Sequence, residues 1–186
     1  MDGTNKTEVF VLDLPDDLTK AAPGFPLEGT DSSRPNVPEG VIQRRLTFSA
    51  NGVVGPRHWL RTTADGKIIA FLSKDNNGII QAFGVSPTDG KIKQLTFNNS
   101  SVQGPFNFSP DGKQLAYLSG NSVYVMDVNT GKSQQLTPRY PEEEKPTNGV
   151  VWSNDDKMIA FNKYVKDDKT GGYFLQIFLL KVSPHL

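Results

Sequence analysis

Cysteine is absent from the 186 residues of this chain, and histidine occurs only twice. Without cysteine the chain can form no disulfide, no thiolate metal site and no cysteine nucleophile. Its two histidines, His58 and His185, are too few for a histidine-rich metal centre. We therefore expect no metal site and no cofactor.

Other signals of function are missing as well. No apolar run approaches the roughly 18 to 20 residues needed to cross a bilayer. Lysine and arginine (20) balance aspartate and glutamate (20), so no excess positive charge attracts nucleic acid or an anionic membrane. No Gly-x-Ser-x-Gly elbow and no glycine-rich phosphate loop are present. These absences exclude a bilayer span and the α/β-hydrolase half of a peptidase, and they leave nucleic-acid binding without support.

What the sequence does contain is a repeat of about 45 residues. Its core is a polar Ser/Thr-x-Asp-Gly/Asp-Lys turn, followed by an apolar run that ends in an aromatic residue. Asp-Gly between β-rich runs favours a tight hairpin, because both residues tolerate a positive φ. The three copies span residues 63–71, 109–117 and 153–161. A repeat of this length built from short strands predicts a propeller blade.

A second phrase, a polar residue followed by Leu-Thr, recurs with the same period. Its copies are Arg45-Leu46-Thr47, Gln94-Leu95-Thr96 and Gln135-Leu136-Thr137. The two phrases together predict an all-β chain, a β-propeller of four-stranded antiparallel blades. We divide it into a partial blade (1–48), two blades (49–98 and 99–137), and a connector with a final incomplete blade (138–186).

The predicted strands number two, four, four and three along the chain, and residues 57–62 are expected to form the first strand of the first complete blade. A blade buries its faces only against its neighbours, and a propeller needs about four or more blades. About three blades plus a partial one therefore make an incomplete ring, with an apolar face open at each end. We expect a part of a larger propeller, or self-association through the open blade faces.

Two stretches between the predicted strands lack a strand pattern. Residues 15–40 contain five prolines, and a loop of this length is either functional or disordered. Residues 138–149 include the acidic run Glu142-Glu143-Glu144. We interpret this second stretch as a solvated connector, with an acidic binding patch as the alternative.

The second repeat, residues 108–119 followed by 122–128 and 135–137, resembles the WD40-like repeat of TolB-type β-propellers. The first repeat departs from it with Thr63-Ala64 in place of Ser-Pro, and the third with Asn154 and Asp156 in place of Pro and Gly. Residues 8–61 resemble, more loosely, an uncharacterised bacterial family of TolB-like proteins about twice this length. Residues 1–6 lack the apolar core of a signal peptide, which leaves the bacterial periplasm and cytoplasm both open.

The resemblance implies several functions, because similar blades serve different ones. They occur in TolB, a protein-binding module, in the non-catalytic propellers of prolyl-oligopeptidase-type peptidases, and in oligogalacturonate lyases. Our first hypothesis is a non-catalytic propeller segment that binds a protein or a small acidic ligand through channel-facing loops. The alternatives are part of a lyase-like enzyme acting on acidic oligosaccharides, which would need a divalent metal, or the propeller of a peptidase.

The channel-facing loops supply the candidate binding residues. First strands of a propeller line its central channel, and the loops that lead into them open on one face, where ligands usually bind. Two guanidinium groups and an imidazole there could hold a carboxylate, such as that of an acidic sugar or a peptide terminus. The same groups could instead be solvated or paired within the protein. The candidate residues are Arg57, His58, Arg61, Gln103, Asn107 and Asn148.

Overall fold

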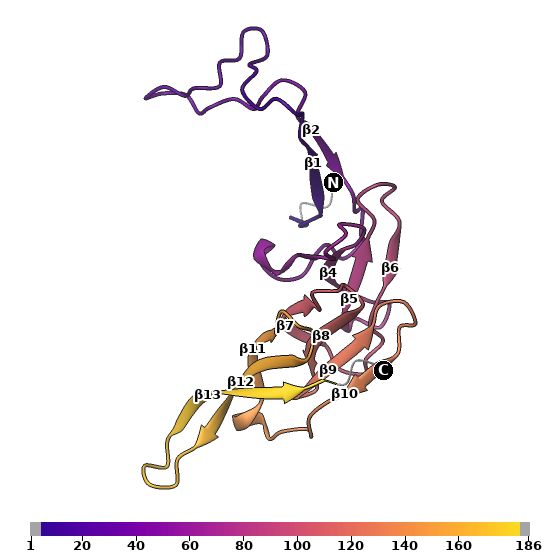
Figure 1. Ribbon diagram of the computed structural model, residues 1–186, viewed down its shortest axis with the longest axis vertical. Coiled ribbons are helices and arrows are strands. Elements are labelled where there is room, and N and C mark those ends of the chain that lie inside the picture. The colour runs from indigo at the N-terminus through magenta and orange to yellow at the C-terminus, as the bar shows by residue number, and fades with distance from the viewer. Residues whose placement is uncertain (1–4, 183–186) are drawn as a thin grey trace.

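The computed structural model describes residues 5–182, which form β-strands joined by turns and loops (Figure 1). Within this range there are two 3₁₀ turns, η1 (Arg57–Trp59) and η2 (Glu142–Glu144), and no helix that could span a membrane. The strands are β1 (Phe10–Asp13), β2 (Ile42–Arg45), β3 (Arg61–Thr62), β4 (Ile69–Lys74), β5 (Ile80–Val85), β6 (Ile92–Gln94), β7 (Val102–Phe108), β8 (Gln114–Ser119), β9 (Ser122–Asp127), β10 (Ser133–Gln135), β11 (Pro146–Trp152), β12 (Met158–Lys166) and β13 (Tyr173–Lys181).

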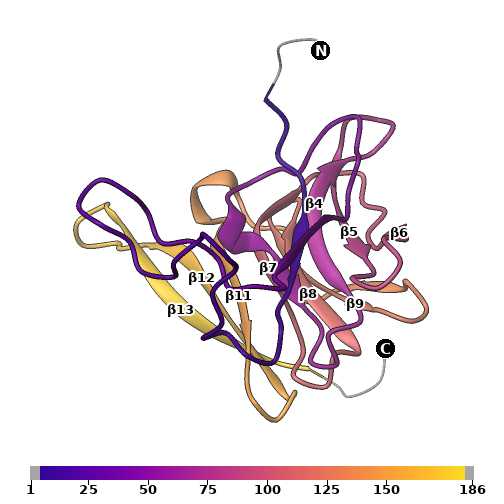
Figure 2. The same cartoon turned by 90° about the horizontal axis from the view of Figure 1, so that it is seen from above.

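These strands form four antiparallel sheets of two, four, four and three strands, as the repeat predicts. Strand order within each sheet follows the sequence: β1-β2, β3-β4-β5-β6, β7-β8-β9-β10 and β11-β12-β13. The sheets follow one another along the long axis of the molecule, and the ring is not closed (Figures 1 and 2). The fold is therefore an all-β, incomplete propeller.

Two predictions about elements are wrong. The first strand of the second sheet begins at Arg61, because residues 57–59 form the turn η1 instead of extended chain. Gly55-Pro56 precedes β3, and Gly104-Pro105 lies at the bend in β7. The first pair stands three residues further from the Asp of its turn than the second pair does, and these three extra residues form η1. The connector is also more ordered than predicted, since it contains η2 and the start of β11 at Pro146.

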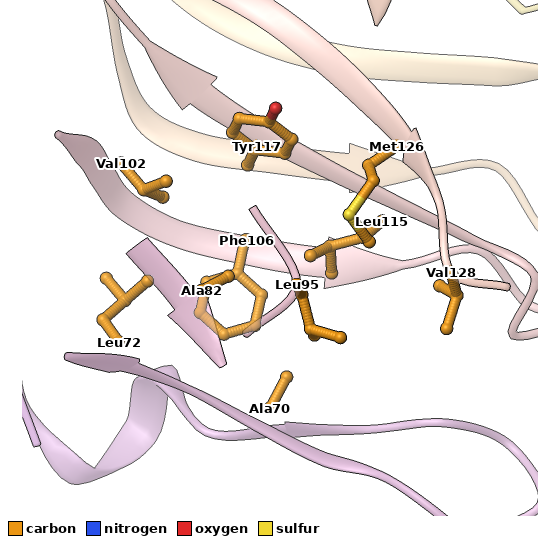
Figure 3. Close-up of a cluster of buried hydrophobic side chains, with 10 residues drawn as sticks. All are labelled: Ala70, Leu72, Ala82, Leu95, Val102, Phe106, Leu115, Tyr117, Met126 and Val128. Carbon is orange, nitrogen blue, oxygen red and sulfur yellow. The ribbon is translucent and has the colours of Figure 1, made fainter. Parts of the chain in front are cut away.

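The core lies between successive sheets rather than inside any one of them. Figure 3 shows the seam between the second and third sheets, where Leu72 and Leu95 meet Phe106, Leu115 and Met126. A second cluster joins β8 and β9 to β11 and β12, and a third joins the N-terminal sheet to β4 and β5. Burying a side chain of this size contributes about 1.5–3 kcal/mol, so the seams supply most of the apolar stabilisation.

One stacked aromatic pair recurs in each of the three larger sheets. It joins the second strand to the third: Phe71 with Phe83, Tyr117 with Tyr124, and Phe161 with Phe178, with ring centroids 5.9, 5.5 and 5.5 Å apart. Because the members of each pair lie directly opposite in the strand register, the pairs align the three sheets residue by residue.

The sheets at the two ends of the stack leave apolar side chains uncovered, as predicted. Phe10 and Leu12 of the N-terminal sheet are about half exposed. On β13, Ile177 is 76% exposed and Leu179 is 62% exposed. Large exposed apolar patches mark interaction surfaces, so both ends of the stack are suited to a further contact.

The predicted irregular stretch, residues 15–40, projects from the end of the β1-β2 hairpin (Figure 1). Only isolated bridges occur in it, between Ala21 and Pro38 and between Ala22 and Phe25. Lys20 and Glu39 pair near its base, at 2.6 Å. The stretch makes no strand, in agreement with its proline content.

The Asp of the repeat orders its turn through local hydrogen bonds. Asp65 Oδ1 accepts from the Thr63 hydroxyl at 2.7 Å and from the Lys67 backbone N–H at 3.1 Å. The equivalent bonds recur in the second copy and the third. The next residue has a positive φ in all three copies, including Asp156 (φ 60), which Asp tolerates better than most side chains. Asp156, which stands in place of glycine in the third copy, therefore preserves the turn.

The Leu-Thr phrase holds the fourth strand to the third. The Leu N–H donates to a third-strand carbonyl, that of Val9, Ala82 or Val123, at 2.8 Å in each case. The N–H of that same residue donates to the Thr hydroxyl at 2.9, 2.8 and 3.0 Å. All three threonines, Thr47, Thr96 and Thr137, are buried. Their hydroxyls thus satisfy a buried backbone donor.

The first residue of the phrase, Arg or Gln, stabilises the phrase through a hydrogen bond inside it. Its side-chain N–H donates to the backbone carbonyl of the Thr two residues later, in Arg45, Gln94 and Gln135 alike, at 2.8, 2.8 and 2.7 Å. Arginine and glutamine are interchangeable here because both provide an N–H donor. The recurring sequence is therefore explained by a recurring set of hydrogen bonds.

We expect the Asp turn to make stability depend on pH. The hydrogen bond from Thr63, and then that from the Lys67 N–H, lower the pKa of Asp65 from 3.8 to about 2. A lowered folded-state pKa stabilises the protein above pH 3.8, and this contribution is lost as the pH falls through about 2. Asp65→Asn should therefore lower the urea midpoint at pH 7, and the difference from the parent should shrink towards pH 2. Asp31→Asn, at an exposed loop position, is the control. A deficit in Asp65→Asn that stayed constant down to pH 2 would contradict this.

We also expect the Thr96 hydroxyl to be important for stability. Thr96→Val keeps the shape of the side chain but leaves the Ala82 N–H and the Gln81 Oε1 without the partner they have at 2.8 Å. The free energy of unfolding should fall by about 1–3 kcal/mol, measured by urea denaturation. Thr88→Val, at an exposed position, should change it by less than about 0.5 kcal/mol. Equal effects of the two variants would refute the role assigned to the buried hydroxyl.

Candidate functional site

The inner strands β3, β7 and β11 lie next to one another, with β7 contacting both of the others. In β7 and β11 the regular pairing is interrupted, between Gln103 and Asn107 and between Thr147 and Val150. Gly104 (φ 67), Asn148 (φ 62) and Gly149 (φ 84) have positive φ values at these interruptions. Such bulges turn side chains out of the sheet, and they are common beside binding sites.

The two bulges pack closely against each other. A Cβ atom on Gly149 would lie 2.6 Å from the carbonyl oxygen of Pro105, which is too short for any real contact. Glycine is therefore required at position 149 both by its φ and by its neighbour. This contact fixes the starts of β7 and β11 relative to each other.

A hollow of about 340 Å³ lies at this point, and we call it the inner-strand hollow. It is near the lower end of the range of volumes found for ligand sites. Residues from η1, β7, β8 and the start of β11 surround it. They are Trp59, Gln103, Gly104, Pro105, Leu118, Lys145, Pro146, Thr147 and Asn148.

The turn η1 brings an indole to the hollow. The Trp59 ring packs on Gly55, where an added Cβ would lie 2.3 Å from a ring carbon. His58 beside it is exposed, with its ring edge-on to Trp59 at 6.5 Å. The side chain of Arg57 is outside what the structure describes. That Arg57 and His58 bind a ligand therefore stays a prediction.

Two of the predicted binding residues are engaged within the protein. Arg61 Nε donates to Asn107 Oδ1 at 2.6 Å, and its Nη1 donates to the backbone carbonyls of His58 and Leu60. Asn107 Nδ2 in turn donates to the carbonyl of Val150. This series joins β3, β7 and β11, and we call it the axial relay. Arg61 and Asn107 therefore link the inner strands of three sheets.

Gln103 and Asn148 are different, because their side-chain amides make no hydrogen bond within residues 5–182. Both line the inner-strand hollow, and Asn148 is exposed. Each amide offers two N–H donors and one acceptor oxygen. Of the five predicted residues whose side chains the structure describes, these two have free hydrogen-bonding groups in the lining of a hollow.

Sequence reasoning missed the groups that hold the far wall of the hollow. Lys163 on β12 is 7% exposed, and its Nζ lies 2.7 Å from Glu144 Oε2. The same ammonium lies 4.7 Å from the centre of the Tyr140 ring and 5.2 Å from that of Phe178, within cation–π range. This ion pair, with a buried lysine and a partly exposed glutamate, anchors the segment that carries Lys145 to Asn148. Its sequence signals were a lysine inside the largely apolar β12 and the acidic run Glu142-Glu143-Glu144, which the sequence pattern indicated to be solvated.

A larger hollow of about 820 Å³ lies between the third and fourth sheets, at the end that carries the Asp turns. Its acidic side chains include Asp111 and Asp155, whose carboxylates already accept hydrogen bonds from their own turns. Within residues 5–182, no group of three or more His, Cys, Asp or Glu side chains is arranged to hold a metal ion. The inner-strand hollow is the better candidate site because the side-chain amides of Gln103 and Asn148 in its lining are free.

Asn107 belongs to the axial relay and Gln103 lines the inner-strand hollow, although both lie on β7. We therefore expect their replacement to change the free energy of unfolding by different amounts. Asn107→Ala removes the acceptor of Arg61 Nε and the donor to Val150, so the free energy of unfolding should fall by about 1–3 kcal/mol. Gln103→Ala removes an amide that has no protein partner, and should change it by less than about 0.5 kcal/mol. Urea denaturation of both variants checks this. A loss in Gln103→Ala as large as that in Asn107→Ala would show that Gln103 is structural.

Comparison with known proteins identifies relatives of the chain. It is 37% identical over 166 residues to "Uncharacterized protein YidR" of Escherichia coli (strain K12), covering 86% of this chain and 40% of that protein. The chain thus spans less than half the length of this curated relative.

Among solved structures, an oligogalacturonate lyase from Vibrio parahaemolyticus superposes with a TM-score of 0.61 at 15% identity, over 94% of this chain and 44% of that one. TolB from Acinetobacter baumannii gives 0.50 at 20% identity, over 73% and 34%. These likenesses show a shared propeller fold.

The family described as the dipeptidyl peptidase IV (DPP IV) N-terminal region matches residues 58–171, more than half of the chain. The chain therefore belongs to the family of the dipeptidyl peptidase IV N-terminal region, with the fold of a TolB-like β-propeller segment.

Proposed function

We propose that this chain is a non-catalytic binding segment that holds an extended peptide of a protein partner in the inner-strand hollow. The observation that carries the proposal is the pair of free amides, Gln103 on β7 and Asn148 on the neighbouring strand β11, in the lining of the hollow. Trp59, the last residue of η1, adds an apolar surface to the same hollow.

Peptide bonds match this lining chemically. Each peptide bond offers one N–H and one carbonyl oxygen, and a side-chain amide can bond to both. A binding site that combines a few polar groups with an aromatic side chain is typical of specific ligand sites. Tryptophan also contributes a large rigid contact area at low entropic cost.

A purely acidic ligand is supported less well by the same geometry. Arg61 uses its guanidinium within the protein, and Lys145 is paired with Glu142. Among the predicted basic residues whose side chains the structure describes, His58 is the one that is exposed. The carboxylate-binding hypothesis would therefore depend on His58, and on Arg57.

Two other functions remain as alternatives. Amides and an indole also suit the hydroxyls and ring faces of a sugar, so part of a lyase-like enzyme acting on acidic oligosaccharides is the second candidate. It would require a divalent metal held by residues beyond the described range. The third is the propeller of a prolyl-oligopeptidase-type peptidase, which family membership favours and which would also present peptide-binding loops.

Tryptophan fluorescence can test the proposal directly. The probes are tetra-alanine with blocked ends, and trigalacturonate with and without Mn²⁺. We expect the peptide to change the emission of Trp59 saturably, with a Kd of about 1 mM, equivalent to about −4 kcal/mol. The signal should vanish in Trp59→Phe, because the other indole, Trp152, is buried and donates to the Asn107 carbonyl at 3.1 Å.

Two variants connect any binding to the hollow. Gln103→Ala and Asn148→Gly each remove one free amide, and glycine accepts the φ of 62° at position 148. Each should weaken the peptide about fivefold, as expected for one hydrogen bond, measured by calorimetry. Thr88→Ala, at an exposed position away from the lining, is the control. Saturable binding of trigalacturonate without peptide binding would reject the peptide proposal in favour of the second candidate.

A further inference from the structure

The segment that joins the third sheet to the fourth differs from the sheets in how it is held, and we call residues 139–145 the strap. It contains η2, and none of its residues is buried. The sheets, by contrast, are held by buried apolar seams. A segment with little buried apolar surface opens at a lower free energy than the core around it. The strap is therefore the part of this region that can open while the sheets stay folded.

Polar contacts with two residues outside the strap, Asn121 and Lys163, hold it in place. At its start the Tyr140 N–H donates to the Asn121 carbonyl at 3.1 Å, and Asn121 Nδ2 donates to Glu142 Oε2 at 3.1 Å. Near its end, Lys163 Nζ lies 2.7 Å from Glu144 Oε2. The same ammonium lies 4.7 Å from the centre of the Tyr140 ring, so Lys163 contacts both ends of the strap.

The strap leads directly into one wall of the inner-strand hollow. Lys145, its last residue, and the three residues that follow it all line that hollow. Pro146, the first residue of β11, has no backbone N–H with which to bond to the neighbouring strand. Lys163 lies opposite Pro146 in the strand register and is outside the lining. The position of this wall therefore depends on the strap, and the strap depends on Lys163.

We infer that the strap is a movable wall that controls access to the inner-strand hollow, and that Lys163 is the positioning residue that holds it closed. With the strap closed, Glu144 is bound by the buried ammonium and Lys145 stands in the lining. With the strap open, Glu144 enters water and the hollow is exposed on this side. Control of peptide affinity rests on the proposed function, whereas the opening of the strap does not.

The two partners of the ion pair differ in burial, and this difference selects the variant for the test. Lys163 is buried, whereas the Glu144 side chain is 32% exposed. Replacement of Glu144 leaves a buried ammonium without its counter-ion, which destabilises the sheet itself. Lys163→Met instead places an apolar side chain of similar length in β12, and the freed carboxylate is solvated. Lys163→Met therefore releases the strap with little effect on the fold.

Hydrogen exchange, followed by NMR at single amides, measures the opening of the strap. The reporters are the N–H groups of Tyr140 and Glu144, which each donate to a backbone carbonyl at 3.1 Å. Both should exchange about tenfold faster in Lys163→Met, as expected for the loss of one charge-assisted hydrogen bond. The N–H of Leu136, which precedes the strap and donates to a carbonyl of β9 at 2.8 Å, should be unchanged.

Two further variants of β12 are the controls. Lys163→Arg keeps a positive charge within reach of Glu144, so exchange in the strap should return close to that of the unaltered chain. Lys166→Met makes the same replacement at an exposed position of the same strand and should change neither reporter. Circular dichroism and the urea midpoint check that all three variants fold.

Access to the hollow is read from Trp59, which lines it. Acrylamide should quench the emission of Trp59 more strongly in Lys163→Met than in the unaltered chain, whereas Trp152 is buried and contributes a constant background. Blocked tetra-alanine should bind Lys163→Met about fivefold more weakly, because only the closed fraction of the molecules presents the complete hollow.

Three outcomes would overturn the inference. One is unchanged exchange at Tyr140 and Glu144 in Lys163→Met, and another is equal acceleration at Leu136, which would make the lysine a general stabiliser of the sheet. The third is faster exchange in the strap with no change in the quenching of Trp59. Equal peptide affinity in the two proteins would reject the control of binding. If the unaltered chain does not bind the peptide, the proposed function fails, and exchange and quenching still decide the inference.

Discussion

Apolar contact between successive sheets is the constraint on which this molecule depends. Each sheet has two apolar faces, and the buried clusters lie in the seams between sheets. A sheet of four short strands cannot bury both faces alone, so it is stable only beside a neighbour. The open faces of the β1-β2 sheet and of β13 follow from the same constraint, because the stack has two ends.

Much of the fold could be predicted because its local chemistry is repeated. Asp-Gly turns and Leu-Thr phrases occupy fixed places in each blade, and each is explained by hydrogen bonds between residues close in sequence or on paired strands. The same local reasoning failed at residues 57–62. An insertion of three residues after Gly55-Pro56 makes a turn, and its residue types are compatible with a strand.

The candidate site was predicted less well, for a physical reason. Sequence reasoning grouped Arg61 and Asn107 with Gln103 and Asn148 because all four stand near the starts of inner strands. Only three-dimensional distances separate the residues that bond to each other from those that face a hollow. Lys163 and Glu144 lie on different elements, β12 and η2, and they are not neighbours in sequence. No local sequence pattern therefore predicts that they pair.

The hydrogen bonds that join the sheets in the axial relay both run from an earlier sheet to the next one along the stack. Arg61 donates to Asn107 and Asn107 donates to the next sheet, whereas the equivalent position in the last sheet is Val151, which can neither donate nor accept through its side chain. The seams are consequently not interchangeable, even though the blades share one repeat. If the second and third sheets exchanged places, the guanidinium would face a valine. The side chains of Arg61, Asn107 and Val151 thus distinguish seams that apolar contact alone would leave alike.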